Sequence, residues 1–142
     1  MDMNTKDAIS LISKIREKSN RFIVSEMLKH GIDSIVTSHG DIIYALFSRP
    51  RLTMAEIADK IGRDKSTVTA LVDKLVRLGY VTKERDTEDT RVVYVALTQK
   101  GIELKPIFET ISSEVLEVFY SNISEKEKEE LIRILNKINN NF

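Results

Sequence analysis

Residues 64–78, DKSTVTALVDKLVRL, separate into an apolar stripe and a hydrophilic face when wound as a helix. At about 100° per residue, five aliphatic side chains share one sector: Val68, Leu71, Val72, Leu75 and Leu78. The opposite side carries Ser66, Ala70, Asp73 and Arg77, flanked by Thr67, Thr69 and Lys74. Small, hydroxyl and basic side chains suit a helix that enters the major groove of DNA. A plain amphipathic surface helix would show the same pattern.

The segments on either side favour the DNA-binding interpretation. TMAEIADKI begins with a capping box of Thr53 and Glu56, and Gly62 ends this short helix. Asp64 is the expected N-cap of the next helix, so about three residues separate the two, as in a helix-turn-helix. Residues 80–85 and 91–98 are β-rich runs joined by a polar loop, which is typical of a hairpin. A helix-turn-helix followed by a hairpin is a winged helix.

Arginines flank the loop of this hairpin. Arg85 precedes it and Arg91 follows it, and a hairpin beside a recognition helix can place arginine in the neighbouring minor groove. Asp86 and Asp89 would be unfavourable near phosphate unless each is paired. Asp89 lies two residues before Arg91 and could hold its guanidinium by a bidentate contact. The alternative is a polar turn with a weak surface ion pair.

The rest of the chain is predicted to be helical. Apolar spacing indicates helices over 5–30, 37–48 and 98–123, and a last helix that Ser124 caps. Ser38 and Asp41 resemble a capping pair, and Pro106 is expected to bend the helix over 98–123. The predicted fold class is mainly α with a small β-hairpin wing. The expected domains are an N-terminal dimerisation helix (1–35), a winged helix-turn-helix DNA-binding domain (36–100) and C-terminal dimerisation helices (101–142).

Composition sets outer bounds on function. The 142 residues have no net charge and no cysteine, which excludes disulfides and thiol chemistry. Residues 63–85 carry six basic and three acidic side chains, about +3, whereas residues 103–130 come to about −5. One segment can therefore face an anion, although a dispersed mixed surface is equally consistent. Neither a membrane span nor a signal peptide is visible, so a cytoplasmic protein is expected.

The sequence resembles the MarR family of winged helix-turn-helix transcription regulators. The matching pieces are LTMAEIADKIGRDKSTVTALVDKLVRLGYVTKERDTEDTRVVYVALTQKG and the closing SEKEKEELIRILNKI. The family pattern is DKSTVT.LVD.L...G in the recognition helix, RD..D.R in the wing and LT..G at the next helix. The detailed match covers residues 50–101. It implies a homodimer whose terminal helices interlock and whose two lobes sit in successive major grooves of a palindromic operator.

The resemblance also implies roles for particular residues. Ser66, Thr67 and Thr69 would face the groove, Lys74 would contact phosphate, and Arg91 would be the wing residue that Asp89 holds. The full set of expected DNA-binding residues is Arg63, Lys65, Ser66, Thr67, Thr69, Lys74, Arg85, Asp89 and Arg91. Two positions depart from the family, because Ala70 and Thr90 stand where many members carry basic residues. Both changes reduce the expected phosphate contacts.

The residues support a dimer independently of the resemblance. About 45 residues after Thr98 have no sheet to cover, yet they are rich in apolar side chains: Ile102, Ile107, Phe108, Ile111, Val115, Leu116, Phe119, Ile123 and Leu131. Leaving this surface in water costs roughly 25 cal/mol per Å². Pairing with a second copy would cover it. The alternative is a monomer in which the first helix folds back over the same surface.

Family members often release DNA when a small aromatic acid binds between the dimer and DNA-binding helices. The candidate lining of such an effector pocket is aromatic: Phe22, His39, Tyr44, Phe47 and Phe108. Aromatic residues at helical spacing also form ordinary core, which is the alternative. Sensing of oxidants through a thiol is impossible without cysteine.

Other functional classes find little support. Glu26 and His30 share a helix face and His39 could approach them, but two histidines are a thin supply for a metal sensor. No phosphate-binding glycine loop or hydrolase motif is present, so no catalytic residue, cofactor or metal is expected. The sequence therefore predicts a dimeric, sequence-specific regulator of transcription that binds double-stranded DNA. It is expected to be a repressor released by a small-molecule effector. The alternative is a winged helix that binds only other proteins.

Overall fold

The computed structural model describes residues 4–142 and places helices around one small sheet. After a short 3-10 turn, η1 (Thr5–Asp7), the elements are α1 (Ala8–Lys29), α2 (Thr37–Leu46), β1 (Leu52–Thr53), α3 (Met54–Ile61), α4 (Lys65–Arg77), β2 (Val81–Arg85), β3 (Val93–Leu97), α5 (Gln99–Ile102), α6 (Lys105–Phe119) and α7 (Glu125–Asn139). The predicted fold class, mainly helical with a β-hairpin wing, is confirmed.

The winged-helix part is built on an aliphatic core. Helices α2, α3 and α4 pack against one another and against the sheet. Nine side chains in this core are almost fully excluded from water: Ile42, Ile43, Leu52, Ile57, Val68, Val72, Leu75, Val81 and Val95. Each contributes about 1.5–3 kcal/mol by leaving water. Three of them come from the predicted stripe of α4, so burial of that stripe fixes which face of the helix points outward.

The sheet has three antiparallel strands in the order β1-β3-β2. Leu52 of β1 pairs with Val95 of β3, and Arg85 of β2 pairs with Val93 at the other end of the hairpin. Strand β1 did not appear in the sequence prediction because two residues carry no periodicity. It anchors β3 to the start of α3, so the wing is fixed to the helix-turn-helix at its base.

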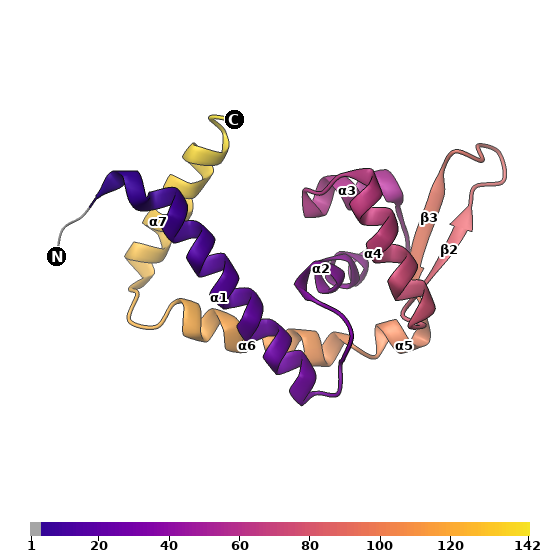
Figure 1. Cartoon of the computed structure of the whole chain (residues 1–142), viewed down its shortest axis with the longest axis horizontal. Helices are drawn as coiled ribbons and strands as arrows, with labels where there is room; N and C mark the ends of the chain where they lie inside the picture. The colour runs from indigo at the N-terminus through magenta and orange to yellow at the C-terminus, as the bar shows by residue number, and fades with distance from the viewer. Residues whose placement is uncertain (1–3) are drawn as a thin grey trace.

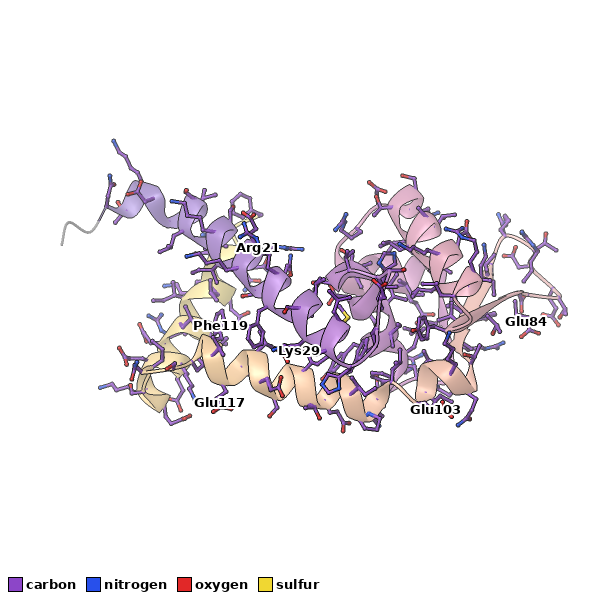
Figure 2. The ribbon with its side chains drawn as sticks, turned by 60° about the horizontal axis from the view of Figure 1, so that its bottom comes forward. Arg21, Lys29, Glu84, Glu103, Glu117 and Phe119 are labelled. Atoms are coloured by element: carbon purple, nitrogen blue, oxygen red, sulfur yellow. The ribbon has the colours of Figure 1, made fainter. Side chains whose placement is uncertain are left out.

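The remaining helices form an extended arm. In Figure 1, α1 packs along α6, and α7 lies at the end of the molecule away from the β2–β3 hairpin. Arg21 of α1 and Phe119 of α6 accordingly lie far from Glu84 of the wing (Figure 2). Many large apolar side chains of this arm remain exposed, among them Ile9, Val118 and Phe119. The apolar surface of the arm is therefore not covered by the chain itself.

Two details of the sequence prediction are wrong. The expected single helix over 98–123 is two helices, because the chain breaks after α5 and Pro106 sits in the first turn of α6, where its missing N–H costs nothing. The second correction concerns the start of α2. Ser38 and Asp41 do not cap it; instead the backbone N–H of Val36 donates to Nδ1 of His39 over 3.0 Å.

Candidate nucleic-acid interface

The start of α4 is fixed by Asp64. Its carboxylate accepts hydrogen bonds from the backbone N–H of Thr67 (2.7 Å) and the hydroxyl of Ser66 (2.9 Å). These bonds, the one from the Thr67 backbone first, lower the pKa of Asp64. The cap satisfies a backbone donor that the helix itself cannot. The expected N-cap is confirmed, and its charge offsets part of the positive helix end that would meet a phosphate.

Along the first two turns of α4, the outward face carries mostly small, hydrophilic side chains. Lys65, Ser66, Thr69 and Ala70 are exposed, and Thr67 is half-buried. The Thr69 hydroxyl donates to the carbonyl of Lys65 over 2.9 Å, which leaves its lone pairs and methyl group facing outward. No bulky side chain would hold this stretch away from base edges.

The wing presents one arginine on a rigid support. Arg91 donates to Asp89 from Nε (3.0 Å), from a terminal nitrogen (3.1 Å) and from its backbone N–H (3.1 Å). The same hydrogen bonds, with the side-chain one as the largest cause, lower the pKa of Asp89 and raise that of Arg91. The Arg91 side chain is nevertheless 89% exposed. A guanidinium fixed at an exposed hairpin tip is arranged to meet an anion from solution.

Asp86 and Arg85 make hydrogen bonds within the loop itself. Asp86 accepts the backbone N–H of Asp89 over 2.9 Å, and its own N–H donates to the carbonyl of Val92 over 2.9 Å. Arg85 turns back and donates to the carbonyl of Thr90. Asp86 and Asp89 are therefore both hydrogen-bonded within the loop, whereas Glu88, the third acid of the loop, is exposed.

A groove between α3, α4 and the wing gathers basic side chains. Lys65 and Thr69 from α4 line it together with Lys83 and Arg91 from the hairpin. Lys83 also donates to Asp73 of α4 over 2.8 Å, which ties β2 to the recognition helix. Sequence reasoning missed Lys83. Strand alternation places it on the same side as the buried Val81, and this signal could have found it.

Two predicted contact residues lie toward α2 rather than on the outer face of α4. Arg63, in the turn between α3 and α4, donates to the Ser38 hydroxyl over 3.2 Å. Lys74 is half-buried, and its charge joins burial of the imidazole, the larger cause, in lowering the pKa of His39. These two residues therefore lie apart from the groove that holds Arg91.

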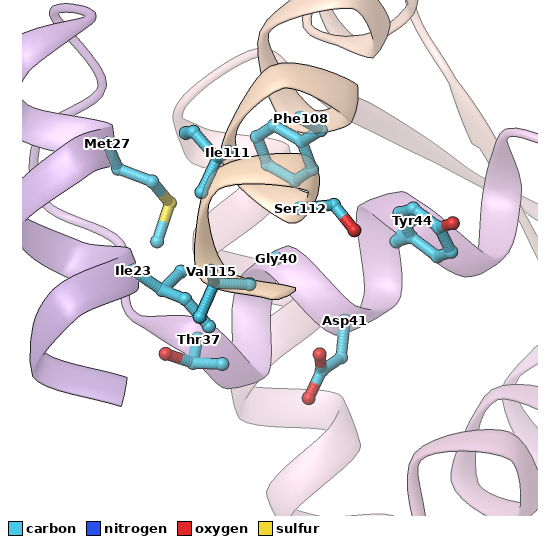
Figure 3. A pocket seen from close by; sticks show the side chains of 10 residues that line it. All are labelled: Ile23, Met27, Thr37, Gly40, Asp41, Tyr44, Phe108, Ile111, Ser112 and Val115. Carbon is cyan, nitrogen blue, oxygen red and sulfur yellow. The ribbon is translucent and has the colours of Figure 1, made fainter. Parts of the chain in front are cut away.

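A cavity of about 290 Å³ lies between α1, α2 and α6, below the winged-helix part (Figure 3). Two of the five predicted effector-pocket residues, Tyr44 and Phe108, line it. His39 is buried and serves as the α2 cap, and Phe47 packs edge-on against the Tyr44 and Phe108 rings at 6.0 and 5.8 Å between centroids. Phe22 is half-buried on α1 and does not line the cavity.

Within residues 4–142, no three His, Cys, Asp or Glu side chains come together as metal ligands. No helix in that range is long and apolar enough to cross a bilayer.

Comparison with known proteins shows which family the chain belongs to. The MarR family profile matches residues 37–93, which span α2, the helix-turn-helix and most of the wing. The SarZ transcriptional regulator of Staphylococcus haemolyticus is 35% identical over 102 residues, which are 71% of this chain and 68% of the relative. This chain belongs to the MarR family. The SarZ regulator of Staphylococcus aureus is 30% identical over the same shares of each chain.

Solved structures share the MarR fold over almost the whole chain. MepR of S. aureus, solved as a complex with DNA, superimposes with a TM-score of 0.85 at 24% identity and covers 99% of this chain and 100% of its own. A MarR regulator from Methanosarcina mazei gives a TM-score of 0.82 at 24% identity, covering 98% and 91%. The extended arm is therefore part of the fold.

Membership in the MarR family settles the broad class of function. The chain is a winged-helix transcription regulator that binds DNA and is not an enzyme. Its recognition helix keeps the small exposed face expected of the family, and its wing keeps the Asp89–Arg91 pair. Ala70 and Thr90, the two departures from the family, are both exposed. Ala70 follows Thr69, which is expected to face the DNA groove, and Thr90 precedes Arg91.

Proposed function

We propose that this protein is a homodimeric repressor that binds a palindromic DNA duplex and leaves it when a small molecule occupies the cavity between α1, α2 and α6. The observation that carries the proposal is the exposed Arg91, held beside the outward face of α4 by Asp89. A helix in the major groove and an arginine in the neighbouring minor groove would together read one half-site.

The residues proposed to contact DNA fall into three groups. Ser66, Thr67 and Thr69 would meet base edges and Lys65 a phosphate, because they start the exposed face of α4. Arg91 would enter the minor groove, with Asp89 as its support. Arg63, Lys74 and Arg85 would neutralise flanking phosphates; for Arg85 this requires the guanidinium to leave the Thr90 carbonyl.

The dimer is proposed from the apolar surface of the arm. Large aliphatic and aromatic side chains are exposed on its three helices and the turn before α7: Ile9, Leu11, Ile12, Ile15, Leu116, Val118, Phe119, Ile123, Ile132, Ile134, Leu135 and Ile138. A monomer rarely exposes so much contiguous apolar surface. A twofold dimer through the arm would place two wings at opposite ends, as a palindrome requires.

The effector is proposed from the position of the cavity. Two of its walls, from α1 and α6, belong to the arm, which comprises the expected dimerisation segments 1–35 and 101–142. The third wall, from α2, belongs to the expected DNA-binding domain, residues 36–100. A ligand there would change the angle between arm and lobe, and so the spacing of two lobes in a dimer. Such a ligand shifts DNA affinity only by its preference for one spacing over the other.

Fluorescence anisotropy tests the DNA-binding part of the proposal. A labelled duplex from upstream of the protein's own gene is titrated at several salt concentrations beside a scrambled duplex of equal composition. We expect tighter binding to the first duplex, with a steep loss of affinity as salt rises. Arg133→Ala, which removes a paired arginine from α7 far from the wing, is the control and should leave both curves unchanged.

A second duplex source makes a negative result informative. If both upstream and scrambled duplexes bind weakly, selection from a random duplex library separates a wrong operator from a wing that does not read DNA. Recovery of no enriched sequence would favour the winged helix that binds only proteins.

A further inference from the structure

The cavity between α1, α2 and α6 has an uneven distribution of polar groups. Its α1 and α6 walls are mostly apolar, with Met27, Phe108 and Ile111 among the lining side chains. The α2 wall presents Thr37, Gly40, Asp41 and Tyr44, which share one helix face at spacings of three and four residues. Figure 3 shows Asp41 and Tyr44 at successive positions along α2, across from Ile23 and Met27. The polar end of the cavity is therefore on the winged-helix side.

Asp41 is an acid without a partner at that end. Within residues 4–142, its carboxylate makes no hydrogen bond and no ion pair within 4.0 Å. Among the lining residues there is no lysine, arginine or histidine. Asp41 is exposed overall, and partial desolvation of its carboxylate raises its pKa, while the positive charges of Arg16 and Arg63 lower it. Arg16 and Lys60 line the adjoining cleft with Asp41, but neither lines the cavity itself.

Tyr44 adds a second feature that suits a cation. Tyr44 lies three residues after Asp41 on the same helix face, lines the same cavity and is 57% exposed. The face of an aromatic ring attracts a cation within about 6 Å, and more strongly where water is excluded. Carboxylate and ring together offer a charge partner and a stacking partner to the same ammonium group.

We propose that the cavity binds an apolar ligand carrying one cationic nitrogen, with Asp41 as the residue that selects the charge. This inference rests on the proposed function and names the chemical class of its effector. It departs from the aromatic acid that the family resemblance implies. An aromatic acid would bring a second negative charge beside Asp41 with no basic side chain on the cavity wall to compensate.

The volume and the apolar walls limit the rest of the ligand. About 290 Å³ is at the small end of ligand pockets and fits one or two fused rings. Thr37, whose hydroxyl oxygen is buried without a hydrogen-bond partner, is a further polar group on this wall. Its hydroxyl can accept a hydrogen bond from an ammonium N–H as well as donate one.

Three naphthalene probes that differ only in the head group test the selection of charge. 2-Naphthylmethylamine is cationic, 2-naphthalenemethanol neutral and 2-naphthoate anionic at neutral pH. Each is titrated into the full-length protein without DNA, and naphthalene fluorescence is followed, because the chain contains no tryptophan. We expect the amine to bind about tenfold or more tightly than the carboxylate, with the alcohol between them. Equal or tighter binding of the carboxylate, or no binding of any probe, would overturn the proposal.

Asp41→Asn tests whether this residue is responsible. The variant should lose the preference for the amine over the alcohol and keep the affinity for the alcohol. Asp59→Asn, an exposed acid on α3 outside the cavity, removes the same charge and should bind all three probes as the wild type does. An unchanged amine preference in Asp41→Asn would assign the selection to another group and refute the proposal. Circular dichroism of both variants checks that the fold is retained.

The two proposals fail in different ways. Probe binding is measured without DNA, so selective amine binding by a protein that does not bind any duplex would refute only the proposed function. A protein that binds its duplex but none of the probes would refute only this inference. Release of the duplex by the amine, absent in Asp41→Asn, is the result expected if both hold.

Discussion

Asp89 holds Arg91 through three hydrogen bonds of 3.0 to 3.1 Å, two of them from the guanidinium and one from the backbone. Both residues lie on a tight loop, and the loop is itself braced by Asp86. A long side chain normally loses rotamer freedom when it binds. At this position part of that loss has already occurred, so in the proposed function Asp89 would prepare Arg91 for the DNA without contacting the DNA itself.

We predict graded losses of DNA affinity at this pair. Arg91→Ala should weaken binding roughly tenfold and make the salt dependence shallower by about one ion. Asp89→Asn should weaken binding less, because the arginine remains but is no longer held. Anisotropy titrations over a range of salt concentrations measure both effects.

The relation between the two residues gives a sharper test. In the double variant Asp89→Asn/Arg91→Ala, affinity should match or slightly exceed that of Arg91→Ala alone, since Asp89 supports binding only through the arginine and its unpaired carboxylate would repel phosphate. Losses that simply add would show that Asp89 has its own role at the interface.

Features that are local in the sequence were predictable from it. The stripe and N-cap of α4, the Thr53–Glu56 capping box and the Asp89–Arg91 pair each involve residues within a few positions of one another. Helical periodicity and turn chemistry act over this range. The family resemblance added the expected palindromic operator, whereas the expected dimer also followed from the apolar residues after Thr98.

Features that depend on packing between distant segments were not predictable. The Lys83–Asp73 contact needs the angle between β2 and α4, and the cavity needs α1, α2 and α6 brought together from residues 23 to 115. Local sequence likewise did not reveal the break after α5. Aromatic character selected Tyr44 and Phe108 but equally Phe47, which packs against both.

Two helical glycines give opposite predictions for alanine. A Cβ at Gly101 would lie 2.3 Å from the carbonyl oxygen of Tyr80 and 2.9 Å from a methyl of Leu97, so Gly101→Ala should lose about 1–3 kcal/mol of stability. At Gly40 a Cβ would lie 3.6 Å from the Phe108 ring, an ordinary contact, so Gly40→Ala should gain up to about 1 kcal/mol from helix propensity. Urea unfolding of both variants measures the difference. Equal effects would contradict the packing around Gly101.

Stability should fall in mild acid because of His39. Burial, with the nearby charge of Lys74, lowers the pKa of its imidazole, and Nδ1 accepts the Val36 N–H. The unfolded chain, with a histidine pKa of about 6.5, therefore binds more protons than the folded one just below that pH. Stability is fully present above about pH 6.5 and is lost as pH falls toward the folded pKa, by no more than about 1.4 kcal/mol per pH unit.

Asparagine at this position isolates the effect. His39→Asn can offer its side-chain oxygen where Nδ1 stood, and it cannot titrate. Between pH 7 and 5.5, the urea midpoint of unfolding should change less with pH in this variant than in the wild type. His30→Asn, at an exposed histidine after α1, should keep the wild-type slope. A wild-type slope in His39→Asn would mean that another group titrates.

Charge on the arm should separate the proposed dimer without unfolding the chain. Ile9 and Val118 are 78% and 60% exposed within one chain, so glutamate at both positions meets water in the monomer but would be buried in a dimer. Light scattering after gel filtration should report one 16.3 kDa chain for Ile9→Glu/Val118→Glu and two for the wild type. Val36→Glu, at a 50% exposed site just before α2, should leave the mass unchanged. A dimer that survives the double change would use another surface.

Arginine at positions 70 and 90, where many family members carry basic residues, should strengthen DNA binding. Ala70 is exposed on α4 one residue after Thr69, and a long basic side chain there could reach a phosphate beside the groove. Ala70→Arg should therefore strengthen DNA binding several-fold and steepen the salt dependence by about one ion. Thr90→Arg should act the same way from the wing. Ala70→Gln, similar in length but uncharged, is the control and should not change the salt dependence.

Because phosphate contacts carry no sequence information, the arginine variants should gain affinity equally on operator and scrambled duplex. A gain confined to the operator would instead mean that position 70 reads a base.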